Sequence, residues 1–319
     1  MLDVFFTVDV EIWCDGWSNI DAKFPSAFQE YIFGNTPFGQ FGLPFQFQIL
    51  NDHGLTGVFF VEPLFSARFG RQPLADIVGM VTEAGQEVQL HLHTEWVDEA
   101  LPPLLPNSNM KRQHLRYFSR NEQSHLIATG LKMLTDAGAS RVNAFRAGSF
   151  GFNIDTLRAL ADCGISIDSS YNATLFGQDS GFMPGITVTE PAVLDTVYEY
   201  PLTVFDDGMR IRHVQLTSCS FEEIEGLLWQ ALRQGRKSFV ILSHGFELLN
   251  MAKDRPDPIA VKRFRKLCAF FNRHRDVFKV RGFGNLSPSA VKEQPAPLTS
   301  PIYRTGWRLA QQLYRKRYQ

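Results

Sequence analysis

Short apolar runs alternate with longer segments of helical period along most of the chain. Most of these runs are continuous in Val, Phe, Ile and Leu, which is typical of strands buried on both faces of a parallel sheet. They predict strands at residues 2–8, 57–61, 87–92, 142–145, 165–168, 213–216, 238–242 and 277–280.

The segments between the runs repeat apolar residues at helical spacing, and most of them are followed by a glycine that can end a helix. They predict helices at residues 43–53, 74–84, 112–137, 154–162, 221–234 and 261–274. Alternation of strand and helix indicates parallel βα units. Seven or eight strands favour a closed barrel over an open sheet, so the predicted fold class is α/β.

Two segments fall outside the alternation. Residues 18–40 are rich in Phe, Gly, Asn and Pro, and we expect an ordered loop there. We expect residues 1–290 to form the barrel and residues 291–319 to form a Pro/Ser-rich linker and a basic C-terminal helix. The cations of that helix lie among aromatic residues, and are Arg304, Arg308, Arg315, Lys316 and Arg317. The pattern fits a peripheral contact with a membrane or a partner, or a helix packed on the barrel.

Composition excludes several classes of protein. The 319 residues are 44% hydrophobic with a net charge of −1, which supplies a large core and argues against disorder and against a nucleic-acid partner. The 28 phenylalanines indicate extensive packing of flat apolar surfaces. Four widely separated cysteines do not form a CxxC motif and are expected to be reduced, buried thiols: Cys14, Cys163, Cys219 and Cys268.

The first residues have no basic segment and no small-residue cleavage site of the kind that signal peptides carry. Apolar runs also stay well short of the roughly 18 residues of a membrane span. We therefore expect a cytoplasmic location; the oligomeric state is not indicated by the sequence.

Polar residues with catalytic or ligating chemistry end five of the predicted strands, where a parallel barrel gathers its functional groups. Period-2 geometry places Asp9 and Glu11 on one side of the first strand. It likewise places His91 and His93 on one side, with Glu95 two residues further. Three more strands end near single polar residues, namely Arg146, Asp168 and His244. Each residue alone has an ordinary structural explanation, but five such strand ends together indicate a functional rim. The remaining histidines are expected to be structural: His53, His114, His125, His213 and His274.

In their order and spacing these motifs resemble the polysaccharide deacetylase family, the carbohydrate esterases that share the NodB homology domain. The resemblance extends from Asp9 to His244 and includes Thr7-Val8-Asp9-Val10, Phe145-Arg146-Ala147-Gly148, Asp168 and Leu242-Ser243-His244. It implies a distorted (β/α)7-type barrel, and its strand number agrees with the one predicted from the apolar runs.

Two family positions differ. Val10 replaces an aspartate ligand of the metal, and Glu95 stands where the family has its second histidine. Glu11 and His93 lie close by, as in a variant branch of the family. The resemblance therefore implies a rebuilt site in which His91 and His93, with Glu11 or alternatively Asp9, bind a divalent metal, most fittingly zinc.

The resemblance also implies roles for the other residues. The reaction would be removal of an acetyl group from an N-acetylated sugar or polysaccharide precursor, with Asp9 as general base and His244 as general acid. Arg146 would keep Asp9 ionised, and Asp168 would orient His244. Substrate-binding candidates are Glu95, Trp13, Trp96, Phe150 and Tyr171; for each aromatic residue, packing at the mouth of the barrel is an equally good explanation.

Two other functions fit the sequence. Loss of a ligand at Val10 and the histidine-to-glutamate change at Glu95 would suit a metal-free hydrolase of a cyclic amide or ureide on the same barrel. A non-enzymatic carbohydrate-binding protein is the third possibility, but binding alone does not require both a base and an acid. The sequence does not indicate which sugar is bound or whether an N- or O-acetyl group is removed.

Overall fold

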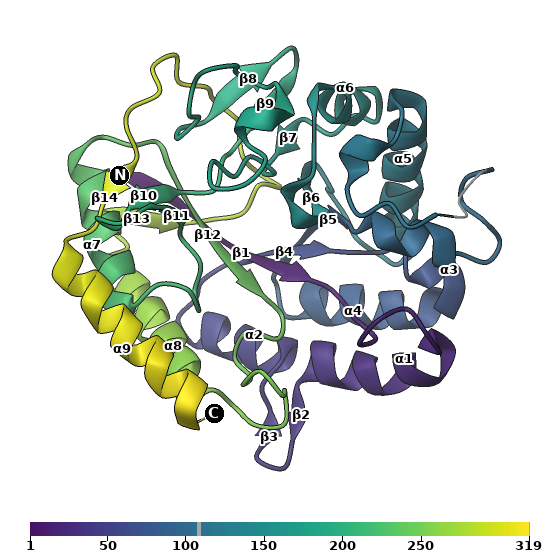
Figure 1. Cartoon of the computed structure of the whole chain (residues 1–319), viewed down its shortest axis with the longest axis horizontal. Helices are drawn as coiled ribbons and strands as arrows, with labels where there is room; N and C mark the ends of the chain where they lie inside the picture. Colours follow the sequence, from purple (N-terminus) through teal and green to yellow (C-terminus); the bar gives the residue numbers. More distant parts are fainter. Residues whose placement is uncertain (107–109, 319) are drawn as a thin grey trace. The chain divides into compact units, whose positions relative to one another are not determined.

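The structure is a computed structural model that describes residues 1–106 and 110–318 (Figure 1). Side chains are described up to residue 315, so the predicted roles of Lys316 and Arg317 lie outside the described residues. The chain forms two compact units. The first unit contains residues 1–57, 203–281 and 297–318, and the second contains residues 58–202 and 282–296. The predicted domain boundary after residue 290 stays a prediction.

The core of the first unit is a group of parallel strands. Strand β1 (Leu2–Val10) pairs in parallel with β12 (Ser238–His244) and with β13 (Phe278–Val280). Every residue of β1 except Asp3 is buried, which explains why the strand is mostly apolar. The three strands confirm three of the predicted ones.

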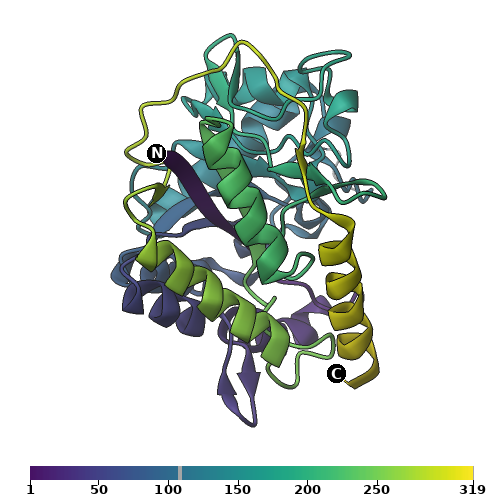
Figure 2. The same ribbon diagram turned by 90° about the vertical axis from the view of Figure 1, so that its left-hand side faces the viewer.

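Four long helices accompany these strands in the first unit, and Figure 2 shows three of them, α7, α8 and α9, from the side. The helices are α2 (Leu43–Asp52), α7 (Phe221–Arg233), α8 (Pro258–Arg273) and α9 (Ile302–Tyr318). Local side chains fix where two of them begin. Ser220 and Glu223 form a reciprocal capping box at the start of α7, and Asp257 accepts two backbone N–H groups at the start of α8.

The expectation of a loop over residues 18–40 is wrong. The segment forms α1 (Ile20–Phe28), a π-helical turn (Gln29–Phe33) and a small hairpin of β2 (Asn35–Thr36) and β3 (Gly39–Gln40). Ile20, Phe24 and Phe28 are buried on one face of α1. Phenylalanines spaced for a helix therefore outweigh Pro25, which normally argues against a helix interior.

The second unit contains a six-stranded sheet in the order β4-β5-β6-β7-β9-β8. Its strands are β4 (Val58–Val61), β5 (Glu87–Leu92), β6 (Ala144–Ala147), β7 (Ile167–Asp168), β8 (Ala192–Leu194) and β9 (Val197–Glu199). All neighbours pair in parallel except β8 with β9. The first four strands match predicted ones, whereas the hairpin β8–β9 lies in a stretch for which no strand is predicted.

Helices connect the strands of this unit: α3 (Ser66–Phe69), α4 (Arg71–Glu83), α5 (Arg120–Asp136) and α6 (Ile154–Asp162). Short 3₁₀ turns occur at Thr94–Glu99, Leu115–Tyr117, Gly148–Phe150 and Gln178–Ser180. Helix α5 begins eight residues later than predicted, because Ser119 and Glu122 form a capping box there. In the sequence the capping box appears as Ser-x-x-Glu, and it predicts the start of α5 better than the helical periodicity does.

The predicted strand at residues 213–216 is displaced. Strand β11 (Ile211–His213) pairs antiparallel with β10 (Val204–Asp206), which also pairs with β14 (Leu298–Thr299). Gln215 makes only an isolated bridge to Leu242. These strands of two or three residues are too short to give a periodic pattern.

Helix α9 is attached to the first unit through its arginines. Arg308 is 4% exposed, and its guanidinium pairs with Asp207 (2.9 Å) and Glu223 (3.2 Å). Arg315 pairs with Asp257, the residue that caps α8. Two cations of the predicted basic helix, Arg308 and Arg315, therefore face acidic partners inside the unit.

None of the four cysteines forms a disulfide, which confirms the expected free thiols. Three are buried, and Cys163 is partly exposed. Burial raises the pKa of Cys219 to about 11, so this thiol stays protonated at neutral pH.

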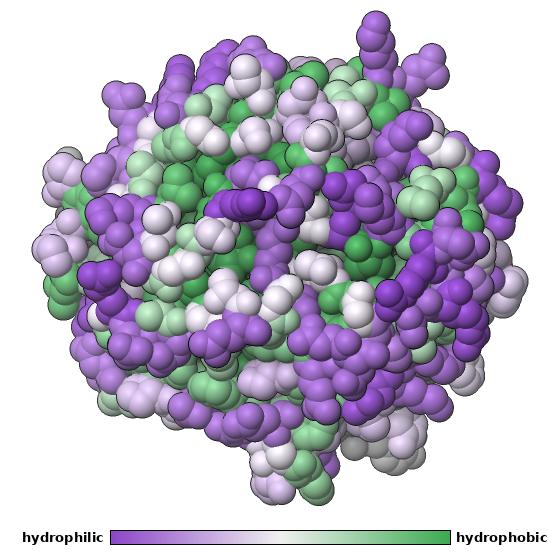
Figure 3. All heavy atoms as spheres, turned by 180° about the vertical axis from the view of Figure 1, so that it is seen from behind, coloured by the Kyte–Doolittle hydropathy of each residue, from purple (hydrophilic) through white to green (hydrophobic). Residues whose placement is uncertain are grey.

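Hydrophilic residues cover most of the face shown in Figure 3, with apolar side chains interspersed among them. Among the described residues, no helix combines the length and the apolar character that a membrane span requires.

The ion pairs of Arg308 give a test of the fold. The Arg308→Ala variant removes the cation paired with the buried Glu223 and leaves Asp207 with only Arg212, at 3.8 Å, so we expect it to lower the free energy of unfolding by about 3–5 kcal/mol. The matched control Arg273→Ala removes an exposed arginine of α8 and should change it by less than about 0.5 kcal/mol. Urea denaturation of both variants measures the difference; similar small losses would contradict the assignment.

Candidate active site

The ends of β1 and β12 bring three candidate residues together in the first unit. Asp9 and His244 are directly paired in the parallel register of the two strands. Glu11 follows two residues after Asp9, and one ligand atom of each of the three side chains lies within 4.8 Å of the other two. Asp9 and Glu11 are buried, at 2% and 8% exposure. This group joins two carboxylates and an imidazole, which can move protons or bind a cation.

Glu11 is held in place by a neighbouring indole. The Nε1–H group of Trp13 donates to Oε2 of Glu11 at 2.8 Å, and Oε1 of Glu11 lies 4.0 Å from Nε2 of His244. Trp13 itself is partly exposed and meets Trp17 edge to face at 5.9 Å. Trp13 thus keeps an accessible ring while it orients a carboxylate.

His244 is oriented by Glu247. Nδ1 of His244 donates to Oε1 of Glu247 at 2.8 Å. Burial alone would lower the pKa of His244, but the hydrogen bond to Glu247 and the charges of Glu11, Glu247 and Asp9 outweigh it and raise the pKa to about 9. The imidazole is therefore protonated at neutral pH, which suits a general acid.

Further residues support Glu247 in turn. Gln215 donates its Nε2–H to Oε1 of Glu247, and Ser243 donates to Oε2 at 3.4 Å. Gln215 also contacts Nε2 of His213 at 3.2 Å. Neither Glu247 nor Gln215 is among the residues predicted from the sequence. An acid three residues after His244 was the available signal for Glu247.

The prediction that Asp168 orients His244 is wrong. Glu247 occupies Nδ1 of His244, and Oδ1 of Asp168 accepts a hydrogen bond from Ser170 at 2.6 Å. Glu247 is close to His244 in the sequence, since it follows three residues later. Asp168, in contrast, ends β7 in the second unit.

In the second unit, β5 positions two buried imidazoles, His91 at 1% and His93 at 4% exposure, with ring centroids 4.8 Å apart. Nδ1 of His91 donates to the carbonyl oxygen of Arg146 at 2.8 Å, and Nδ1 of His93 donates to Oε2 of Glu95 at 3.2 Å. Both acceptors fix the proton on Nδ1 and leave the lone pair on Nε2. This is the arrangement in which histidines bind metals.

Gly148 makes room for His93. A Cβ atom at Gly148 would lie 2.8 Å from Nδ1 of His93 and 2.6 Å from the carbonyl oxygen of Leu92. The glycine after Arg146-Ala147 is therefore required by the close approach of β6 to His93.

Two glutamates border these imidazoles. Glu95 is 7% exposed and is the hydrogen-bond partner of His93; its predicted role in substrate binding stays a prediction. Glu62 follows β4, is 1% exposed, and accepts the N–H groups of Leu64 and Phe65. Burial raises the pKa of Glu62 to about 8, although these hydrogen bonds and His93 act against the shift. Glu62 is not among the predicted residues, yet it directly follows an apolar run, the same signal that identified Asp9.

Arg146 is fully buried, and its charge acts on the buried carboxyl group of Glu199. Its guanidinium donates to the backbone oxygen and to Oγ of Ser169, at 3.0 and 3.1 Å, and stacks over Phe60. Burial raises the pKa of Asp168 and raises the pKa of Glu199 still further, where the charge of Asp168 adds to the effect. Oδ2 of Asp168 and Oε2 of Glu199 each lack a hydrogen-bond donor among the described residues. A proton on Glu199 would let the two carboxyl groups share a hydrogen bond.

The predicted aromatic residues divide into two groups. Trp96 and Tyr171 are 1% and 0% exposed; Trp96 packs edge-on against Phe65, and the hydroxyl of Tyr171 donates to Ile186. Packing, the alternative left open for them, explains both. Phe150 is partly exposed and has a left-handed backbone (φ 58°). Phe150 and Trp13 therefore remain candidates for stacking on a sugar.

Comparison of the sequence with protein-family models and with curated proteins finds no match. Solved structures do match. A protein from Mycobacterium smegmatis assigned as a polysaccharide deacetylase has 17% sequence identity and a TM-score of 0.56, over 92% of this chain and 95% of that chain. A 4-alpha-glucanotransferase from Thermococcus litoralis has 10% identity and a TM-score of 0.54, over 94% of this chain and 42% of its own. A family 4 carbohydrate esterase from Streptomyces lividans has 13% identity and a TM-score of 0.44, over 92% and 97% of the two chains.

The chain thus has the fold of the polysaccharide deacetylases, and the resemblance based on the five motifs is confirmed at the level of fold. The predicted α/β class and distorted (β/α) barrel are confirmed with it.

The hydrogen bond between His244 and Glu247 gives a test of the site. In the Glu247→Gln variant the imidazolium loses its carboxylate partner, so we expect the pKa of His244 to fall from about 9 by about one unit or more. Proton NMR titration of the metal-free protein measures the shift. The control Glu225→Gln on α7 should leave it unchanged. An unaltered pKa in Glu247→Gln would show that the other carboxylates alone account for the shift.

Proposed function

We propose that the protein is a metal-dependent hydrolase that removes the acetyl group from an N-acetylated sugar or polysaccharide precursor. The observation that carries the proposal is the state of His91 and His93, two buried neighbours whose Nδ1 protons are both held by oxygen acceptors. A histidine that serves only as packing does not need this, whereas a ligand presents Nε2 in this way. The fold shared with the Mycobacterium smegmatis protein supports the proposal.

The donor set fits a divalent cation. His91, His93 and Glu11 would hold it, and two imidazoles with one carboxylate favour zinc and leave a ligand position open. When bound, such an ion supplies a Lewis acid that polarises the acetyl carbonyl and lowers the pKa of a water molecule. Val10, where the resemblance implies a carboxylate ligand, contributes nothing, and Glu11 would take over that function.

Asp9 would act as general base. Its carboxylate lies opposite His244 in the strand register, so base and acid are neighbours at one strand end. By the resemblance, Arg146 would orient Asp9. A proton on Glu199 would reduce the negative charge around Arg146.

His244 would donate its proton to the leaving amine. Glu247 supports this role because it keeps Nδ1 protonated and raises the pKa, so that Nε2–H is present at neutral pH. After donation, the proton that Asp9 took from water returns to the neutral imidazole and restores the imidazolium. The partly exposed rings of Trp13 and Phe150 would stack on the sugar.

Metal content gives the first test. We expect the purified protein to contain about one zinc ion per chain, and we expect His91→Ala and His93→Ala to lose it together with acetate release from N-acetyl sugars. His125→Ala, an exposed histidine of α5 in the same unit, is the matched control and should keep both. Acetate release by a chain without metal would favour the metal-free hydrolase instead.

The proton-transfer roles give a second test. Asp9→Asn should lower kcat by roughly 10²–10⁴-fold while zinc content and sugar binding persist, because the amide cannot accept a proton. Isothermal titration with the sugar and an acetate assay measure the two properties. Sugar binding in a parent protein without turnover would support a carbohydrate-binding protein and overturn the enzymatic proposal.

A further inference from the structure

The outward side of α9 is apolar. Six side chains on it are between 41% and 69% exposed: Ile302, Tyr303, Trp307, Leu309, Leu313 and Tyr314. With 3.6 residues per turn they form two adjacent ridges, one aliphatic and one aromatic, and Gly306 and Ala310 lie between the ridges. The whole outward arc of the helix is therefore covered by apolar groups.

The charged side chains of α9 lie on its other side. Arg308 and Arg315 point into the first unit, where they pair with acids. Within residues 302–315, the part of α9 whose side chains are described, no charged residue lies on the outward arc. This is the reverse of an ordinary surface helix, which turns its charges to water and its apolar face to the core.

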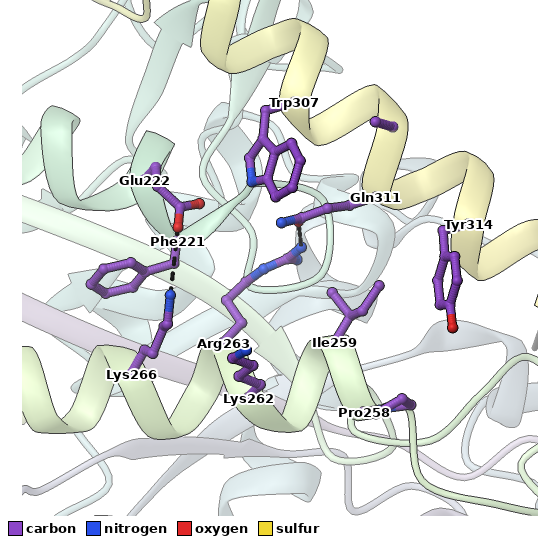
Figure 4. A pocket seen from close by; sticks show the side chains of 11 residues that line it. Phe221, Glu222, Pro258, Ile259, Lys262, Arg263, Lys266, Trp307, Gln311 and Tyr314 are labelled. Carbon is purple, nitrogen blue, oxygen red and sulfur yellow. Dashed lines mark hydrogen bonds and ion pairs between the residues drawn. The ribbon is translucent and has the colours of Figure 1, made fainter.

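A groove runs beside this face, between α8 and α9 (Figure 4). Its volume is about 590 Å³. Trp307, Ala310 and Tyr314 line it from α9, and Pro258 and Ile259 line it from α8. The aromatic ridge of α9 therefore continues into a mostly apolar groove.

Cations border the apolar surface. Lys262 and Lys266 of α8 line the groove, and Arg304 follows Tyr303 at the start of α9. Lys266 lies 3.6 Å from Glu222, whereas Lys262 and Arg304 have no carboxylate partner among the described residues. Helix α9 contains no acidic residue.

We propose that α9 and this groove bind the surface of an anionic lipid membrane. Tyr303, Trp307 and Tyr314 would lie at the level of the headgroups, as such rings do at membrane interfaces, while the aliphatic ridge enters the acyl boundary. The bordering cations complement anionic headgroups.

Two features favour a membrane over a protein partner. The face is a convex helix side rather than a shaped pocket for particular side chains. It also mixes interfacial aromatic residues with aliphatic ones, and the cations along its edge outnumber the one acid that lines the groove, Glu222, as expected for in-plane membrane helices. The inference does not depend on the deacetylase activity, and it assigns the contact to apolar residues rather than to the basic residues expected from the sequence.

Co-sedimentation with lipid vesicles tests the proposal. We expect the full chain to bind vesicles of phosphatidylcholine with phosphatidylglycerol more tightly than vesicles of phosphatidylcholine alone. The double variant Trp307→Ser/Leu313→Ser should bind at least about tenfold more weakly, because it removes two large apolar groups from the contact. Both side chains are more than half exposed, so the variant should keep its fold.

The matched control is Phe38→Ser/Met251→Ser, which removes one aromatic and one aliphatic side chain of 71% and 89% exposure elsewhere in the same unit. It should bind vesicles as the parent does. Absence of vesicle binding by the parent, or equal binding by parent and Trp307→Ser/Leu313→Ser, would overturn the proposal. A parent that is a dimer without lipid affinity, and that this variant converts to a monomer, would instead identify α9 as an interface between two copies.

Discussion

The candidate chemistry depends on one kind of interaction. In each of the three candidate histidines, His91, His93 and His244, the Nδ1–H group donates a hydrogen bond to an oxygen atom of this chain. Backbone oxygen does this for His91, Glu95 for His93 and Glu247 for His244. The consequence differs with the acceptor's charge and surroundings. His91 and His93 present a lone pair, whereas His244, beside several carboxylates, carries a second proton. The same type of hydrogen bond thus makes His91 and His93 potential metal ligands and His244 a potential general acid.

Much of this was accessible from the sequence because parallel strands gather their terminal residues at one end. The alternation of apolar and polar positions was sufficient to select Asp9, Glu11, His91 and His93. Partners within a few residues, such as Glu95 and Glu247, could also have been found from local spacing. The capping box at Ser119 is a similar local signal, and it defines the start of α5 better than helical periodicity does.

Partners distant in sequence were not accessible. Glu199 belongs to a three-residue strand in a stretch without periodicity, and its place beside Asp168 follows from the pairing of β7 with β9. The direction in which Arg308 and Arg315 of α9 point also depends on acids 58 to 101 residues away in the chain. A sequence shows that a helix is basic, but not which of its charges are already neutralised.

The arginines of α9 have a consequence for the integrity of the first unit. Asp207, Glu223 and Asp257 are almost fully buried, and each receives a guanidinium from this one helix. Proteolytic removal of this helix would take these guanidinium groups away from Glu223 and Asp257 and leave Asp207 with Arg212 alone, at 3.8 Å. Helix α9 therefore supplies counterions to buried acids of the first unit. Its removal would lower the stability of that unit and promote its unfolding.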